Sequence, residues 1–183
     1  RLYRSRRRHR IHRNSHIGEI MTLVSLIATV GGVGHLRPAP GTWGSLAGLV
    51  LGWALASITG WIGLLIGTVI VFYVGRWATD MVTRGTDNHD PSEVVVDEVA
   101  GQWVALLPVV IGASMSNSAL LDLWPGWIAA FALFRLFDIK KPWIVGHYDR
   151  MDTPHGVMMD DICAGAMAAV GVVALPAAAH LVM

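Results

Sequence analysis

Residues 90–103 read DPSEVVVDEVAGQW, and their acidic pair Asp97-Glu98 is followed by 23 residues without a formal charge. A second pair, Asp160-Asp161, precedes the last 22 residues, which are also uncharged. Carboxylates beside hydrocarbon are costly unless they are neutralised, so acids in membrane segments usually mark functional sites. A divalent cation is the simplest partner for several clustered acids, because such ions prefer oxygen ligands. The two pairs therefore predict a cation site at a membrane surface.

The composition is that of a membrane protein. Hydrophobic residues make up 54% of the 183 residues, charged residues 15%, and the mean hydropathy is +0.51. A soluble domain usually carries about 25% charged residues. Seven of the 14 Lys and Arg residues fall within residues 1–13. We expect residues 1–16 to be a disordered basic tail that contacts anionic lipid rather than nucleic acid, and residues 17–183 to form one membrane-embedded domain.

The spacing of charges predicts an all-α, polytopic helix bundle. No charge occurs between Arg37 and Arg76, a gap of 38 residues, whereas one spanning helix needs about 20. This gap fits two crossings with a turn at residues 57–60. The run after Glu98 is broken near residues 114–126 and predicts a second hairpin, and residues 162–183 can cross once. We expect about five transmembrane helices, or four if one arm is re-entrant, with residues 21–30 interfacial or packed on the bundle.

Two hairpins return the chain to its starting side, so residues 31–45, 76–98 and 135–161 share one face of the membrane. All 14 Lys and Arg residues lie on that side, as do 11 of the 13 acids. Positive residues favour the cytoplasmic side of a membrane. The sequence therefore predicts a site on the cytoplasmic face of the membrane.

Each acidic pair has a glycine one helical turn after its ligand candidate: Gly101 follows Asp97, and Gly165 follows Asp161. Small residues at this spacing allow helices to approach closely, so two such helices can direct both pairs at one ion. Adjacent residues are about 100° apart around a helix, and each pair can supply one ligand and one base or supporting group. The alternative is a plain N-terminal cap, because acids favour helix N-termini.

Cations lie between the pairs, in FRLFDIKKPW. Arg135 offers a fork of donors suited to phosphate, and Lys140 and Lys141 offer point charges, although lysines at a membrane boundary can also simply extend into water. Asp138 is a further ligand or the partner of Arg135. Upstream, Thr42 or Ser45 can cap an apolar helix whose free N–H groups suit an anion.

Four segments in order resemble the phosphatidylglycerophosphatase A family of bacterial lipid phosphatases: PAPGTWGSLAG (38–48), HDPSEVVVDEVAGQW (89–103), FRLFDIKKPW (134–143) and GVMMDDICAG (156–165). The family usually has Gly-Gly before the last segment, where this chain has Thr153-Pro154. The resemblance implies Mg²⁺-dependent hydrolysis of phosphatidylglycerol phosphate to phosphatidylglycerol and inorganic phosphate, with a phospholipid as substrate. It also implies a multi-pass protein of the bacterial inner membrane.

On this hypothesis Mg²⁺ is held by four acids, Asp97, Glu98, Asp160 and Asp161, with Asp138 as a further ligand or orienting group. Arg135, Lys140, Lys141 and Thr42 would bind the substrate phosphate. Metal-activated water is favoured over an aspartyl-phosphate. The competing hypotheses are a lipid head-group transferase with the same metal site and a non-enzymatic transporter or scaffold. The sequence leaves the oligomeric state open.

Overall fold

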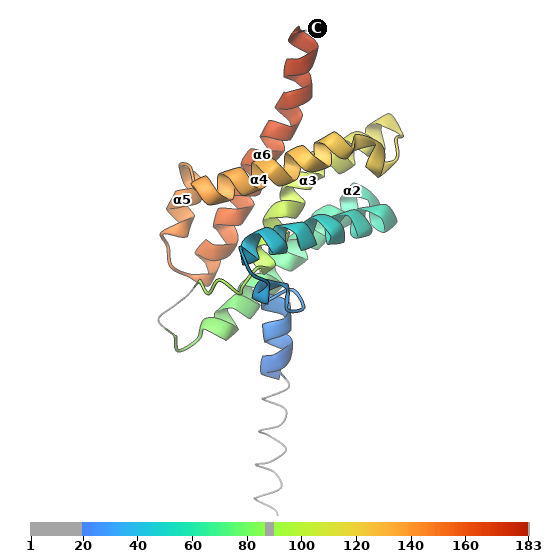
Figure 1. Ribbon diagram of the computed structural model, residues 1–183. Coiled ribbons are helices and arrows are strands. Elements are labelled where there is room, and N and C mark those ends of the chain that lie inside the picture. Colours follow the sequence, from blue (N-terminus) through green and yellow to red (C-terminus); the bar gives the residue numbers. More distant parts are fainter. Residues whose placement is uncertain (1–19, 87–89, 183) are drawn as a thin grey trace, which may run out of the picture.

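The computed structural model describes residues 20–86 and 90–182, in which helices and turns occur and no strand is present. Residues 20–28 are helical. They are followed by η1 (Val33–His35), α2 (Pro40–Thr83), α3 (Val96–Ser116), η2 (Leu120–Leu123), α4 (Trp124–Lys140), α5 (Ile144–Asp149) and α6 (Pro154–Val182) (Figure 1). The predicted all-α class is confirmed. The predicted basic tail, residues 1–16, lies outside the described residues.

Four helices are long and apolar enough to cross a membrane: Pro40–Thr83, Val96–Ser116, Leu120–Lys140 and Pro154–Leu175. The first of them doubles back at Gly60, whose φ of 68° and ψ of −165° interrupt the helix. Side chains are strained in this region of φ/ψ space, and glycine is not. A Cβ atom added at Gly67 would lie 2.7 Å from the side chain of Leu55, so the two arms pack side by side. The predicted turn at residues 57–60 is thus confirmed, and each arm approaches the length of one crossing.

The ends of the helices place the acidic residues at one end of the bundle. Asp97 and Glu98 are in the first turn of α3. Helix α4 stops at Lys140 because Lys141 adopts a left-handed conformation with φ of 45°, and Pro142 follows it. Figure 1 shows the turn of α2 and the turn around η2 on the right of the view, with α5 on the left. The helix starts and stops therefore gather the two acidic pairs and Asp138 on the side away from the two hairpin turns.

Helices α3 and α6 approach each other closely at their glycines. A Cβ atom at Gly165 would overlap the carbonyl oxygen of Gly101, and a Cβ at Gly101 would lie 2.6 Å from the carbonyl oxygen of Asp161. The obstacle in both cases is backbone, which cannot rotate away. The close approach expected from the glycine one turn after each acidic pair is confirmed, and it holds the two pairs together.

Replacing Gly165 by alanine is expected to destabilise the protein by about 1–3 kcal/mol, the usual cost of overfilling a packed core, even though alanine favours helices. The thermal unfolding midpoint in detergent measures this loss. Gly112→Ala in α3 is the matched control, because a Cβ there would meet only Leu123, at 3.5 Å. A Gly165→Ala protein as stable as the Gly112→Ala protein would contradict the close contact between α3 and α6.

The helical residues 20–28 pack on the bundle rather than standing apart from it. Val24 and Ala28 are buried in a cluster that includes Val96 and Met158. The Val95 N–H donates to the carbonyl of Ala28 at 2.9 Å. Of the two alternatives for residues 21–30, packing on the bundle is therefore the one observed, and it fixes the backbone immediately before α3.

Candidate active site

The predicted acids line a single cavity of about 240 Å³. Its walls come from the start of α2, the segment before α3, the first turn of α3, the end of α4 and the early turns of α6. The lining residues are Pro40, Gly41, Asp90, Ser92, Val94, Asp97, Glu98, Asp138, Ile139, Lys141, Val157, Asp160 and Asp161. Segments separated by more than a hundred residues in the chain thus meet at one end of the bundle.

Three carboxylates from three helices form the centre of this cavity. Glu98 of α3, Asp138 of α4 and Asp161 of α6 each offer an oxygen atom, and these atoms lie within 4.8 Å of one another. Carboxylate oxygens are the ligands that Mg²⁺ and Ca²⁺ prefer. A Cβ atom at Gly41 would overlap the Glu98 carboxylate, so the glycine leaves room for that group. The donor atoms and the space beside them fit a divalent cation.

The two acids of each pair differ in what their carboxylates contact. Asp97 Oδ1 accepts the N–H of Glu98 at 2.9 Å, and Asp160 Oδ1 accepts the N–H of Asp161 at 2.9 Å. Each first acid therefore fixes the backbone of the acid that follows it. All four predicted ligands line the cavity, but the tight group consists of Glu98, Asp161 and Asp138, with Asp97 and Asp160 beside it.

Arg135 joins two of the clustered acids. Its Nη1 atom lies 2.6 Å from Glu98 Oε2 and 2.7 Å from Asp138 Oδ2, and it also donates to Ser45 Oγ at 3.2 Å. The side chains of Arg135, Glu98 and Asp138 are only 14%, 11% and 13% exposed. Since Arg135 and Asp138 are three residues apart on α4, the predicted shared face is confirmed. In this arrangement Arg135 is the counter-ion of the cluster.

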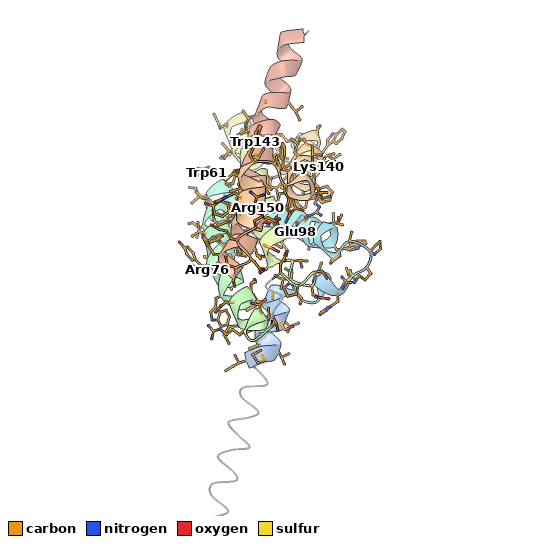
Figure 2. All side chains as sticks on the ribbon, turned by 90° about the vertical axis from the view of Figure 1, so that its left-hand side faces the viewer. Trp61, Arg76, Glu98, Lys140, Trp143 and Arg150 are labelled. Carbon is orange, nitrogen blue, oxygen red and sulfur yellow. The ribbon has the colours of Figure 1, made fainter. Side chains whose placement is uncertain are left out.

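Lys140 and Lys141, for which the sequence predicts the same role, lie in different surroundings. Lys141 lines the cavity, donates to Asp160 Oδ2 at 3.1 Å and contacts Asp149. Burial alone would lower the pKa of the Lys141 ammonium, but the hydrogen bond to Asp149 and the nearby Asp160 raise that pKa above its ordinary value. Lys141 is therefore a cation throughout the neutral range. Lys140 is exposed and is not among the lining residues; in Figure 2 it lies apart from Glu98.

Thr42 does not line the cavity, whereas Ser45 contacts the cluster directly. Ser45 is fully buried, and its hydroxyl donates to Glu98 Oε2 at 2.7 Å. Thr42 is half-buried in the first turn of α2, with its N–H bonded to the Ala39 carbonyl. The sequence presented both residues as possible caps. The signal for Ser45 was its place one turn after Gly41, on the side of α2 that packs on α3.

Gln102 is a further polar residue that the sequence did not single out. It follows Glu98 by one helical turn, is fully buried, and neither atom of its amide group has a hydrogen-bond partner among the described residues. Its side chain packs against Gly48, because a Cβ atom added at that glycine would lie 3.2 Å from the Cβ atom of Gln102. Gln102 belongs to the segment HDPSEVVVDEVAGQW (89–103), but an uncharged amide at the start of an apolar run forms no charge or metal-ligand pattern by which to recognise it.

The fold and the site together define a multi-pass helical membrane protein with an acidic cavity at one end of its bundle. Residues 26–176 match the family model described as phosphatidylglycerophosphatase A. The chain belongs to this family of phosphatases, and the resemblance expected from the four segments is confirmed.

Two relatives carry the name of this family, and a third carries the name of another phosphatase. A phosphatidylglycerophosphatase A of Haemophilus influenzae is 36% identical over 157 residues, which cover 85% of this chain and 90% of the relative. The Escherichia coli protein of the same name is 35% identical over 153 residues, or 79% of this chain and 78% of the relative. A Bacteroides thetaiotaomicron protein, provisionally named as a phosphatidylinositol-3-phosphatase, is 40% identical over 145 residues, covering 76% and 85%. No solved structure gives a significant match.

Proposed function

We propose that this phosphatase removes the terminal phosphate from phosphatidylglycerol phosphate, giving phosphatidylglycerol and inorganic phosphate in bacterial phospholipid synthesis. The single observation that supports it best is the convergence of Glu98, Asp138 and Asp161 within 4.8 Å, in a chain whose relatives carry the name of that activity. The site would lie on the cytoplasmic face of the inner membrane, because the Lys and Arg residues within 20–86 and 90–182 gather at that end of the helices.

Mg²⁺ is the cofactor that we propose for the acidic cluster. Glu98, Asp138 and Asp161 would hold it, with Asp97 and Asp160 supporting the backbones of Glu98 and Asp161. When bound, the ion would supply Lewis-acid stabilisation of the phosphate charge and would lower the pKa of a water molecule. The fit rests on hard oxygen donors drawn from three helices.

The remaining residues of the cavity would bind the phosphate and move the proton. Lys141, held between Asp149 and Asp160, presents a fixed positive charge to phosphate oxygens. Among the acids of the cavity, Glu98 and Asp138 are paired with Arg135, and Asp160 is paired with Lys141. Asp161 belongs to the cation cluster, and Asp90 precedes α3 and lies outside both acidic pairs. We therefore propose Asp97, beside the cluster in the first turn of α3, as the general base for the attacking water. An aspartyl-phosphate is the alternative, and trapping a phosphoenzyme would establish it.

The function is tested with purified protein in detergent. Phosphatidylglycerol phosphate is supplied with Mg²⁺ or with a chelator, and free phosphate is measured. We expect phosphate release that requires Mg²⁺ and needs no alcohol acceptor, which distinguishes a hydrolase from a head-group transferase. Phosphatidylinositol 3-phosphate is the comparison substrate, in view of the name of one relative. Release from that lipid alone, or no release from either, would contradict the proposal.

The two neighbouring lysines provide a matched pair of variants. Lys141→Met should lower kcat/KM about tenfold to a hundredfold, which is the effect of losing a hydrogen bond from a charged group. Lys140→Met should leave kcat/KM almost unchanged, because Lys140 is exposed and does not line the cavity. Equal losses in the two variants would show that Lys140 also reaches the substrate.

A further inference from the structure

A second cavity, of about 490 Å³, lies outside the acidic site. It is lined by Tyr73, Arg76, Trp77 and Asp80 from the second arm of α2 and by Thr153, Pro154 and His155 at the start of α6. None of these residues lines the acidic cavity. Figure 2 shows Arg76 apart from Glu98. The first turns of α6 therefore separate two cavities, each with its own set of side chains.

Arg76 brings a positive charge that the surrounding protein leaves available. Asp80, one turn later, is engaged by Arg84, with Nη2 at 2.6 Å and Nε at 3.1 Å from the same carboxylate oxygen. No ion pair of Arg76 occurs within residues 20–86 and 90–182. The guanidinium group presents several N–H donors in a plane that matches phosphate oxygens. The N-terminal end of α6 borders the same cavity and favours an anion.

The position of this cavity along the helices corresponds to the head-group region of a membrane. Arg76 is the first charged residue after 38 uncharged ones. Tyr73 and Trp77 flank it and are 63% and 47% exposed, and such rings are typical of membrane interfaces. The ring of His155 meets Phe72 and Tyr148 edge to face, which holds that wall of the cavity in place.

An apolar track leads from the cavity along the arm of α2. Ile66, Ile70 and Tyr73 follow one another at a spacing of three to four residues and are 55%, 56% and 63% exposed. Residues at this spacing lie on one face of a helix. A lipid whose phosphate lies at Arg76 can thus place an acyl chain along this face. Basic pockets between membrane helices at the cytoplasmic boundary are known settings for anionic lipid head groups.

We propose that this second cavity binds the phosphate of an anionic phospholipid, with Arg76 as the main contact and an acyl chain along Ile66, Ile70 and Tyr73. The inference rests on the membrane character of the chain and not on the catalytic role of the acidic cavity. The same phosphate chemistry is offered by the diester of bulk anionic lipid and by the monoester of a lipid phosphate, and the experiment separates these two sources.

The test is native mass spectrometry of the full chain in detergent, titrated with phosphatidylglycerol or with phosphatidylcholine. The wild type should retain phosphatidylglycerol in preference, and Arg76→Gln should weaken that binding about tenfold, as expected for a lost charge-assisted contact. Arg150→Gln is the control, since Arg150 is also exposed but lies outside the cavity. An unchanged thermal unfolding midpoint in lipid-free detergent verifies that the Arg76→Gln protein is folded.

A further arm adds phosphatidylglycerol phosphate to the Asp161→Asn variant, so that hydrolysis does not consume the ligand. Tighter binding of this monoester than of phosphatidylglycerol, lost on adding Arg76→Gln, would identify a lipid phosphate as the occupant. Equal binding of the two lipids would identify bulk anionic lipid. Retention of phosphatidylglycerol by Arg76→Gln at wild-type affinity, or equal binding of phosphatidylcholine by the wild type, would overturn the proposal. A failure of phosphate release in the functional assay would leave this binding result untouched.

Discussion

Asp161→Asn is expected to lower the turnover of phosphatidylglycerol phosphate about a thousandfold, which corresponds to about 4 kcal/mol of transition-state stabilisation. Asp161 is almost fully buried, and within the described ranges no Lys or Arg side chain forms an ion pair with it. Its oxygen lies within 4.8 Å of oxygens from Glu98 and Asp138. Asparagine keeps the shape of the side chain but removes the negative charge that a cation requires.

A second measurement on this variant does not depend on activity. If the cluster binds Mg²⁺, the ion should stabilise the wild type by about 2.7 kcal/mol when its free concentration is a hundredfold above Kd. The thermal unfolding midpoint should rise accordingly. The Asp161→Asn protein should lose most of this increase. Without Mg²⁺ it should be at least as stable as the wild type, because one of three mutually repelling carboxylates has been neutralised.

Asp122→Asn is the matched control for Asp161→Asn. Asp122 lies in η2 and accepts the N–H of Ala119 at 3.0 Å, a hydrogen bond that the asparagine oxygen can also accept. We expect wild-type turnover and an unchanged response to Mg²⁺. The cation site is refuted if Asp161→Asn responds to Mg²⁺ as the Asp122→Asn control does.

Arg135→Met should cost about 3–5 kcal/mol of folding free energy, because it leaves two buried carboxylates without their counter-ion. Its guanidinium contacts Glu98 and Asp138 in a largely buried setting. Turnover should also be lost, since the position of the Glu98 carboxylate depends on Arg135 and Ser45. The thermal unfolding midpoint and phosphate release, both in detergent, report the two effects separately.

Two further variants show whether the loss comes from unpaired buried charge. Adding Glu98→Gln to Arg135→Met removes one of the carboxylates that were left unpaired, so stability should partly return while activity does not. Arg37→Met is the control, because Arg37 pairs with Glu93 at 3.0 Å with side chains 54% and 39% exposed. Exposed pairs contribute at most about 1 kcal/mol. If Arg135→Met is no less stable than Arg37→Met, Arg135 is not the counter-ion of the cluster.

Much of the fold could be predicted from the distribution of charges. The uncharged gap between Arg37 and Arg76 is longer than one crossing, so a turn was required, and Gly60 supplies it. The four segments of the family resemblance also held the acids of the cavity. The contact between Gly101 and Gly165 could be anticipated from small residues at helical spacing. How closely the two backbones approach could not be anticipated.

The composition and local patterns of this sequence determined an all-helical membrane protein with most of its acidic residues at one end. These features depend on hydrophobicity and helical period, which are local properties of the chain. Only the tertiary structure decided which acids form the cluster and which lysine joins them. Two adjacent acids differ by about 100° around a helix, so the partner of each is set by how α3, α4 and α6 pack. Lys141 reaches the cavity and Lys140 does not, because α4 ends between them with Lys141 in a left-handed conformation, and no periodicity encodes that change of direction.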